Sequence, residues 1–383
     1  MTDLEANSRK KYIQKKQVIV IITCFFWIFT KLFSFKLWHA DRLYPLVPPF
    51  RFLENIPNYI HLGLFWSALF GLFLIAFNQK NKVLIAITLT IEFCSCLLDQ
   101  NRWQPYQYQY FITILFLLCY QKNSKQFLNY FSFLIIIIYI NSGLHKFTGA
   151  FLYSVWETMI LHRFFGLEKA SIDSLFIHYS GLSLGFLEFV AAIGLLFSRY
   201  KKIAALLLIG MHLFILLLIS PTGLNYNSIV WPWNVAMILF LYLLFCRESE
   251  NYISWKDLLK GYNKIHLFYL GILPIFCFFG WYDNFLSFNL YSGTLKRLEI
   301  CIENKEKATK YEQFIKNKSW FCKSGSVIKV NDWSLKEMNI VTYPEDRFLF
   351  GVIKKFKVRN PEIEATYIIT QYPYQEKNTK YYK

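Results

Sequence analysis

The residues most able to do chemistry stand at the end of one long apolar segment. Residues 127–146 are apolar along most of their length and close with Asn141, Ser142, His145 and Lys146. A lysine at a membrane boundary can extend its ammonium to the lipid headgroups, which is a structural role. A lysine held away from water instead favours its neutral form and can accept a proton. Both interpretations stay open on these residues alone.

The stretch that follows, residues 147–165, carries Trp156, Glu157 and Arg163 among bulky apolar residues. Such a mixture is typical of an amphipathic helix lying in the membrane interface rather than of a second span. We therefore expect this segment to lie beside the lysine at the membrane surface.

Other ionisable residues lie in or beside neighbouring apolar segments. Glu92 and Asp99 are seven positions apart, which places them on one face of a helix. Glu188 and His212 each stand inside a later apolar segment. A charge in hydrocarbon costs about 2.5 to 3.5 kcal/mol on insertion scales, so such residues face the interior of a bundle. Together they predict a polar cavity that opens outward.

Structural roles for these residues stay open as well. His212 alone is explained by a satisfied hydrogen bond between helices. Glu188 is explained equally by a plain buried ion pair with Lys146 or with Arg102.

Composition places the chain among polytopic membrane proteins. Of its 383 residues 55% are hydrophobic and 20% aromatic, and several apolar runs are long enough to cross a bilayer. The net charge of +17 is concentrated in short segments between these runs, so membrane orientation and anionic lipid explain it better than nucleic acid does. The basic arm at residues 9–16 leads into an apolar run without a small-residue cleavage site, so we expect a retained anchor.

The sequence predicts a mainly α-helical bundle of about nine spans followed by a small β-containing domain. The expected spans are residues 17–37, 57–77, 83–98, 106–120, 127–146, 175–197, 203–219, 229–245 and 266–286. Basic clusters then fall on one side, which predicts a cytoplasmic N-terminus in a bacterial plasma (inner) membrane. The same alternation brings Asp99, Arg102, Lys146 and the segment 231–234 together near the outer surface.

Residues 1–286 are expected to form the helical domain and residues 287–383 an extracytoplasmic domain of β or α+β type. The tail holds short β-leaning segments interrupted by turn formers. Of the eight cysteines only Cys301 and Cys322 stand in a polar context, which makes them the candidate disulfide if the tail is outside. The cysteine spacing predicts no metal site.

Two segments resemble a known family. Residues 139–147 followed by Trp156 are similar to the pattern Y-x-x-(A/S)-G-x-x-K-(L/F)…W of the vitamin K-dependent γ-carboxylase-like, or HTTM, membrane family. Residues 97–110 are similar to that family's L-L-D-x-x-x-W…Y-x-Y segment. Glu188 and His212 match an acidic residue and a histidine of the following spans.

The resemblance implies that Lys146 acts as a base on a reduced quinone of menaquinone or vitamin K type. Oxygen then converts the quinone into a strong base that removes a proton from the substrate, and carbon dioxide traps the carbanion. It implies a quinol-dependent modification of a peptide or small molecule at the outer face, with membrane lipid as the surroundings and no metal. The expected substrate and quinone pocket comprises Asp99, Arg102, Trp103, His145, Trp156, Glu157, Glu188, His212, Trp231 and Asn234.

The chain also departs from the family. The eukaryotic enzymes carry a longer loop before the lysine helix and a large lumenal domain, whereas residues 121–126 form a short turn here and the tail is small. A non-catalytic membrane protein is therefore the competing hypothesis, either a DoxX-like redox accessory or an immunity or assembly partner. The lysine at position 146 favours the enzyme.

Overall fold

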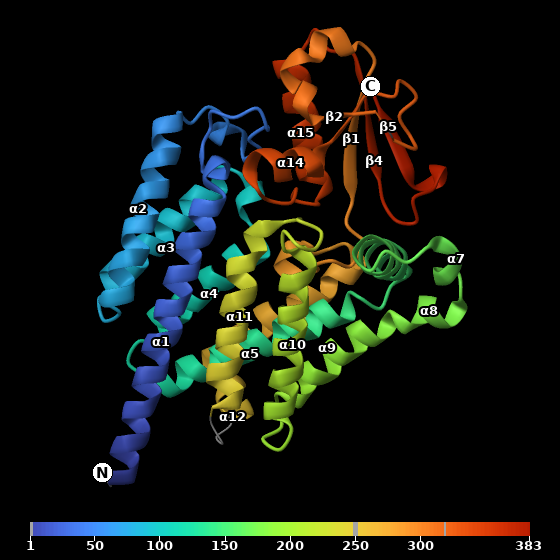
Figure 1. The fold of residues 1–383 in the computed structure, drawn as a ribbon. Helices are drawn as coiled ribbons and strands as arrows, with labels where there is room; N and C mark the ends of the chain where they lie inside the picture. The colour runs from blue at the N-terminus through green and yellow to red at the C-terminus, as the bar shows by residue number, and fades with distance from the viewer. Residues whose placement is uncertain (1–2, 248–251, 318) are drawn as a thin grey trace.

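A helical bundle carries a small sheet domain at one end. The computed structural model describes residues 3–247, 252–317 and 319–383. Figure 1 shows the N-terminus at one end of the bundle and the C-terminal unit at the opposite end. The longer helices are α1 (Asp3–Phe33), α2 (Asn58–Phe77), α3 (Lys82–Leu97), α4 (Pro105–Cys119), α5 (Ser124–Leu144), α9 (Leu182–Gly194), α10 (Lys201–Ile219) and α11 (Trp231–Leu241).

Shorter helical segments connect them. A π-helix, η4 (Leu152–Phe164), continues the short α6 (Gly149–Phe151), and a second, η6 (Tyr242–Cys246), continues α11. The remaining segments of the bundle are η1 (Phe35–Trp38), η2 (Arg51–Leu53), η3 (Gln100–Arg102), α7 (Lys169–Ile172), α8 (Leu175–Ser180), η5 (Ser228–Val230), α12 (Trp255–Leu258), η7 (Gly261–Asn263), α13 (Lys264–Leu267), η8 (Phe268–Ile272), η9 (Leu273–Phe279) and η10 (Phe285–Ser287).

Six helices within the described ranges are long and apolar enough to cross a membrane, so the chain has the helices of a membrane protein. They are Asn7–Phe33, Asn58–Phe77, Ser124–Leu144, Leu175–Gly194, Lys201–Ile219 and Ser228–Cys246. The other three expected spans are also helical but shorter or interrupted. α3 has 16 residues and α4 has 15, and residues 264–279 form a succession of short segments.

Local sequence signals set several helix ends. The side chain of Asn81 caps α3 by accepting from Leu84 N, and that of Asn123 caps α5 by accepting from Gln126 N. Pro105 occupies the first turn of α4, where its missing N–H costs nothing.

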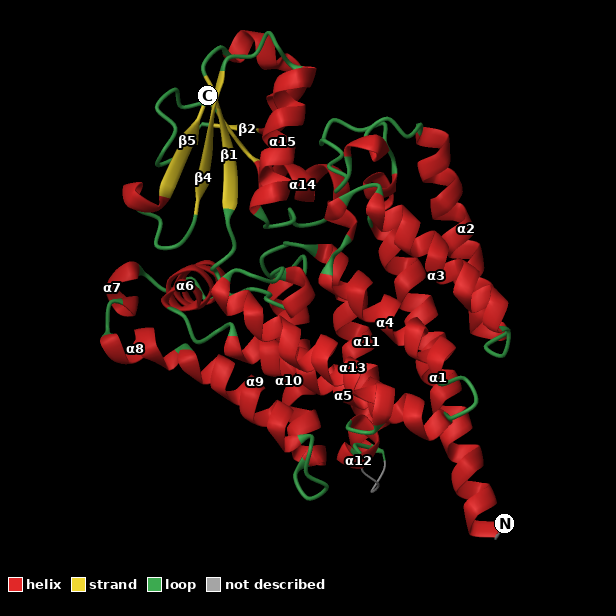
Figure 2. Cartoon of the chain, turned by 180° about the vertical axis from the view of Figure 1, so that it is seen from behind, coloured by secondary structure: helices red, strands yellow, loops and turns green. Residues whose placement is uncertain are grey.

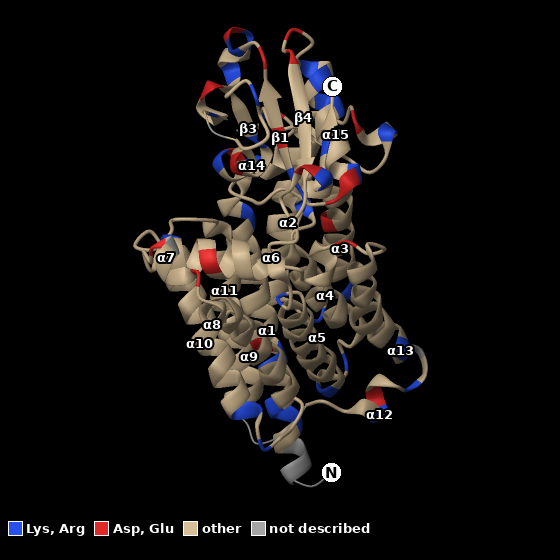
Figure 3. Cartoon of the chain, turned by 90° about the vertical axis from the view of Figure 1, so that its right-hand side faces the viewer, with Lys and Arg blue, Asp and Glu red and all other residues tan. Residues whose placement is uncertain are grey.

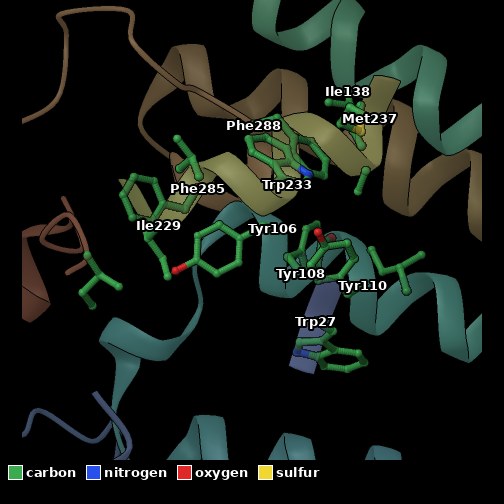
Figure 4. Packing of buried hydrophobic residues seen from close by; sticks show 14 of the residues in the cluster. Trp27, Tyr106, Tyr108, Tyr110, Ile138, Ile229, Trp233, Met237, Phe285 and Phe288 are labelled. Atoms are coloured by element: carbon green, nitrogen blue, oxygen red, sulfur yellow. The ribbon is translucent and has the colours of Figure 1, made fainter. Parts of the chain in front are cut away.

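The helix α5 is the centre of the bundle. Its apolar stretch is 89% buried, whereas the apolar stretch of α2 is only 39% buried. α5 packs against α1, α4 and α9. Figure 4 shows the aromatic packing between α1, α4 and α11, where Trp27 lies beside Tyr110 and Trp233 lies beside Tyr106. Trp233 Nε1 donates to Gln109 Oε1 at 2.7 Å and Trp27 Nε1 donates to Gln107 Oε1 at 2.6 Å, so both indole N–H groups of this core have an acceptor.

The C-terminal unit is an α+β domain. Its antiparallel sheet has the order β2-β3-β1-β4-β5, and two helices pack against the sheet (Figure 2). Its elements are β1 (Arg297–Ile302), η11 (Lys305–Phe314), β2 (Ile315–Lys316), β3 (Val327–Lys329), α14 (Val330–Met338), α15 (Asp346–Arg359), β4 (Ala365–Thr370), η12 (Glu376–Asn378) and β5 (Thr379–Tyr382). Cys301 and Cys322 form a disulfide, with their Cα atoms 5.4 Å apart. This is the pair expected from the sequence.

Specific hydrogen bonds attach this unit to the bundle. Asn101 Oδ1 accepts from Tyr343 N at 2.8 Å. The carboxylate of Glu337 accepts from the backbone nitrogens of Leu43 and Tyr44 at 2.8 and 2.9 Å. Figure 3 shows Lys and Arg gathered near the N-terminal end and over the C-terminal unit, while the middle of the bundle is mostly without charge.

Candidate functional site

A cavity of about 360 Å³ lies among α5, α9, α10, α11 and η4. Its wall is mostly aliphatic and aromatic. The expected base Lys146 lines it, together with three of the residues expected to form the pocket: Glu188, His212 and Asn234. An apolar cavity with a few convergent polar groups is the usual form of a small-molecule site. The cavity is therefore the candidate site.

An ion pair forms one part of the polar wall. Lys146 Nζ is paired with Glu188 Oε2 and also donates to Ser142 Oγ at 2.8 Å. The Glu188 side chain is 3% exposed and that of Lys146 is 15% exposed. Because the surroundings are apolar, electrostatic interactions with a bound group are stronger here than in water. The ion pair with Glu188 holds the Lys146 ammonium at the cavity, so the side chain does not extend toward lipid headgroups in this structure.

Two glycines bring the ion pair together. A Cβ atom on Gly143 would lie 2.9 Å from Phe189 N, and one on Gly185 would lie 2.9 Å from Lys146 Cβ. Both distances are shorter than side chains tolerate, so only glycine permits α5 and α9 to approach this closely. Glu188, one turn beyond Gly185 on α9, consequently meets Lys146.

A hydrogen-bonded chain forms the second part of the polar wall. Asn234 Nδ2 donates to Val230 O at 2.8 Å, which leaves Asn234 Oδ1 to accept from His212 Nδ1 at 2.7 Å. A histidine that donates through Nδ1 accepts through Nε2 when it is neutral. Tyr139 Oη lies 2.6 Å from His212 Nε2 and supplies that donor. Tyr139 also lines the cavity, so this chain of hydrogen bonds reaches the cavity wall.

Asp99 and Arg102 lie outside this cavity, in a separate buried cluster. Arg102 donates to Ser95 O at 2.8 Å and lies 2.9 Å from His61 Nδ1. Asp99 is ion-paired with Arg42. These contacts hold the loop after α1 against the end of α3, which is a structural use of both residues.

His145 and Trp156 flank the cavity without lining it. The ring of His145 stacks on Phe278 with centroids 4.3 Å apart. Trp156 Nε1 donates to Ile177 O at 2.8 Å. The sequence neighbour of the lysine therefore points away from it, because successive residues of a helix face different sides.

The other expected pocket residues also lie elsewhere. Glu157 pairs with His178 at 2.5 Å on the outside of η4. Trp103 packs edge to face with Phe111. Trp231 is half-buried at the start of α11, one turn before Asn234, and does not line the cavity.

The structure contains a further buried ion pair, between Lys31 and Glu92, that the sequence analysis did not anticipate. Lys31 Nζ lies 2.9 Å from Glu92 Oε2, and the two side chains are 1% and 0% exposed. The same oxygen accepts from Gln107 Nε2 at 3.1 Å, and the ammonium lies 3.2 Å from the ring centroid of Trp38. Lys31 lies in the first apolar run, which the sequence predicts only as an anchor. The presence of Glu92 inside another predicted span was the signal that could have identified its partner.

Among the described residues no group of three or more His, Cys, Asp or Glu side chains is placed to hold a metal ion. The polar groups at the cavity that could take part in a reaction are the Lys146–Glu188 pair and the Asn234–His212–Tyr139 chain. Such a site can accept a proton from an acidic hydroxyl and stabilise the anion that results. No family model, curated protein or solved structure matches the chain.

Proposed function

We propose that the protein is an integral membrane enzyme that binds a lipid-soluble quinol in this cavity and removes a proton from its hydroxyl. The observation that carries the proposal is that a buried Lys146–Glu188 pair lines a mostly apolar cavity. An aromatic ring head fits aliphatic walls, and its hydroxyl needs polar partners at one end. Lys146 and Tyr139 offer them.

The proton is accepted by the pair as a unit. Lys146 accepts the proton when the proton of the ion pair lies on Glu188 and the lysine amine is neutral. The quinol O–H bond breaks, its proton goes to the Lys146 amine, and the electron pair stays on the quinol oxygen. The products are a quinolate and an ammonium beside a neutral Glu188, so the new anion faces a cation in an apolar site.

The resemblance to the γ-carboxylase-like family supports the further proposal that the quinolate reacts with oxygen and drives modification, in particular carboxylation, of a peptide or small molecule. Nine spans, a cytoplasmic N-terminus in a bacterial plasma membrane and an outer C-terminal unit belong to the same proposal. The basic clusters between the apolar segments support this orientation.

The test compares Lys146→Arg and Lys146→Ala with the wild type. Arginine can keep the ion pair with Glu188, but its guanidinium does not lose a proton at any useful pH. We expect both variants to lose about 10²- to 10⁴-fold in turnover, the range for a lost general base. The measurement is oxidation of a reduced menaquinone by purified protein with oxygen and bicarbonate present.

Lys296→Arg is the matched control, because Lys296 is a partly exposed lysine of the C-terminal unit whose partner is also a carboxylate. It should leave turnover unchanged. Equal turnover in the wild type and both Lys146 variants would refute a base at this position. No turnover in any of them would favour the non-catalytic alternative, a redox accessory or an assembly partner.

A further inference from the structure

The cavity has an opening on its side, between α9 and α10. Leu187 on α9 and Leu207 on α10 both line the cavity, yet they are 52% and 54% exposed. Gly210 also lines it, and no atom lies within 4 Å of the position that its Cβ would take. The wall is therefore incomplete at the surface that a bilayer would contact.

The opening follows from how the two helices are joined. At their connected ends they touch, since a Cβ on Gly194 would lie 3.0 Å from Ala204 Cβ. From there α9 and α10 diverge, as Figures 1 and 2 show. The π-helix η4 covers the wide end, where Val155 and Met159 line the cavity. The space between the helices is thus closed at one end, covered at the other and open at the side.

The chemistry along the opening is that of hydrocarbon. Within α9 the only ionisable residue is Glu188, and in α10 beyond Lys202 it is His212. Both point inward and are 3% and 5% exposed. A water-soluble ligand has no polar surface to follow between these helices. An apolar chain finds apolar surface on both sides, because Leu187 lines the α9 side and Leu207 and Met211 line the α10 side.

The cavity is too small to hold a long-tailed lipid entirely. Its volume of about 360 Å³ is near the lower end for ligand pockets, which span about 300 to 1,000 Å³. A polar ring head can occupy it beside Lys146. A tail of several isoprene units has to leave the cavity, and the opening between α9 and α10 is bordered by lipid-compatible residues.

We infer that the quinol enters the cavity between α9 and α10, with its ring head beside Lys146 and its single apolar tail in the bilayer through the same opening. This inference rests on the proposed function and assigns the route by which the quinol reaches Lys146. Leu187, Leu207 and Gly210 form the edge of the opening and determine tail access.

Gly210→Trp tests the inference, because the new side chain would occupy the open space beside the cavity. Gly63→Trp is the matched control. Gly63 is also an exposed glycine in a span, with no atom within 4 Å of its Cβ position, but it lies on α2 away from the cavity. Proteins in lipid nanodiscs are assayed with menaquinol-4, which has a four-isoprene tail, and with menadiol, which has none.

We expect Gly210→Trp to raise the KM for menaquinol-4 at least tenfold more than it raises the KM for menadiol, while Gly63→Trp changes neither KM. Leu187→Trp narrows the opening from the other helix and should give the same selective loss if Gly210→Trp does not fold. If Gly210→Trp and Leu187→Trp change the KM values for menaquinol-4 and menadiol equally, the inference is overturned and the proposed function is left intact. A wild type that oxidises neither quinol would overturn both.

Discussion

The buried pair Lys31–Glu92 should stabilise the bundle only as a pair. Glu92 Oε2 accepts hydrogen bonds from Lys31 Nζ at 2.9 Å and from Gln107 Nε2 at 3.1 Å. Glu92 Oε1 has no hydrogen-bond partner in the described part of the chain. If Lys31 is removed, the carboxylate keeps one amide donor and no counter-ion.

This arrangement sets the size of the effect. Removing one member of a buried ion pair costs about 3 to 5 kcal/mol, because the remaining charge is buried without compensation. We therefore expect Lys31→Met to lower the free energy of unfolding by that amount. Combining it with Glu92→Gln removes both charges, keeps an acceptor for Gln107 and should restore most of the loss.

The measurement is equilibrium unfolding of the detergent-solubilised protein for the two single variants and the double variant. Lys296→Met is the control, since Lys296 and Asp346 form a pair of 2.5 Å whose side chains are 31% and 50% exposed. Exposed pairs contribute about 0.2 to 1 kcal/mol. Lys31→Met lowering the free energy of unfolding no more than Lys296→Met does would show that the pair adds little stability. A double variant as unstable as Lys31→Met would show that the unpaired Glu92 charge is not the cause of the loss.

Two further predictions concern the C-terminal unit. Cys301 and Cys322 should be found linked by mass spectrometry without reductant, because the unit is proposed to lie in an oxidising compartment; free thiols in freshly isolated protein would count against that location. Their separation of 21 residues gives the bridge roughly 3 kcal/mol in the chain-entropy account. Burial raises the pKa of Glu345 above its ordinary 4.5, so the folded state holds this proton more tightly than the unfolded state. Stability from Glu345 is then present below about pH 4.5 and lost as pH rises through the raised pKa, and Glu345→Gln should make melting curves between pH 4 and 7 less dependent on pH.

The sequence predicted where the helices occur, and most of their ends to within a few residues, but it did not predict the interruptions in the last expected span. Apolar runs mark spans because hydrocarbon excludes charge, and helices occur in all nine expected ranges. The expected ranges 83–98 and 106–120 agree with α3 and α4 to within one residue at each end, and a mostly buried polar turn from Asp99 to Gln104 separates the two helices. In the tail, attention to β-leaning segments missed α15, although Phe348, Leu349, Val352, Ile353 and Phe356 follow the helical period and all of them are buried.

The sequence pointed to several polar residues of the site, but not to the side of its helix on which each one lies. Charge alternation between the spans could place Asp99, Arg102 and Lys146 near one membrane surface. It gives no information on which neighbours each helix faces in the plane of the membrane. That depends on close helix contacts, such as the one between Gly143 and Gly185 that joins Lys146 to Glu188.

The two buried Lys–Glu pairs separate a structural use of charge from a chemical one. Lys31 and Glu92 are enclosed by protein, with Gln107 donating to Glu92 and the ring of Trp38 beside the Lys31 ammonium. Around Lys146 and Glu188 part of the space is a cavity. A buried pair is costly to form, so selection for stability alone favours filling its surroundings or replacing it by apolar residues. Loss of Lys146 should therefore affect turnover more than stability, and loss of Lys31 should do the reverse; a Lys146→Ala protein as destabilised as Lys31→Met, with unaltered quinol oxidation, would contradict that distinction.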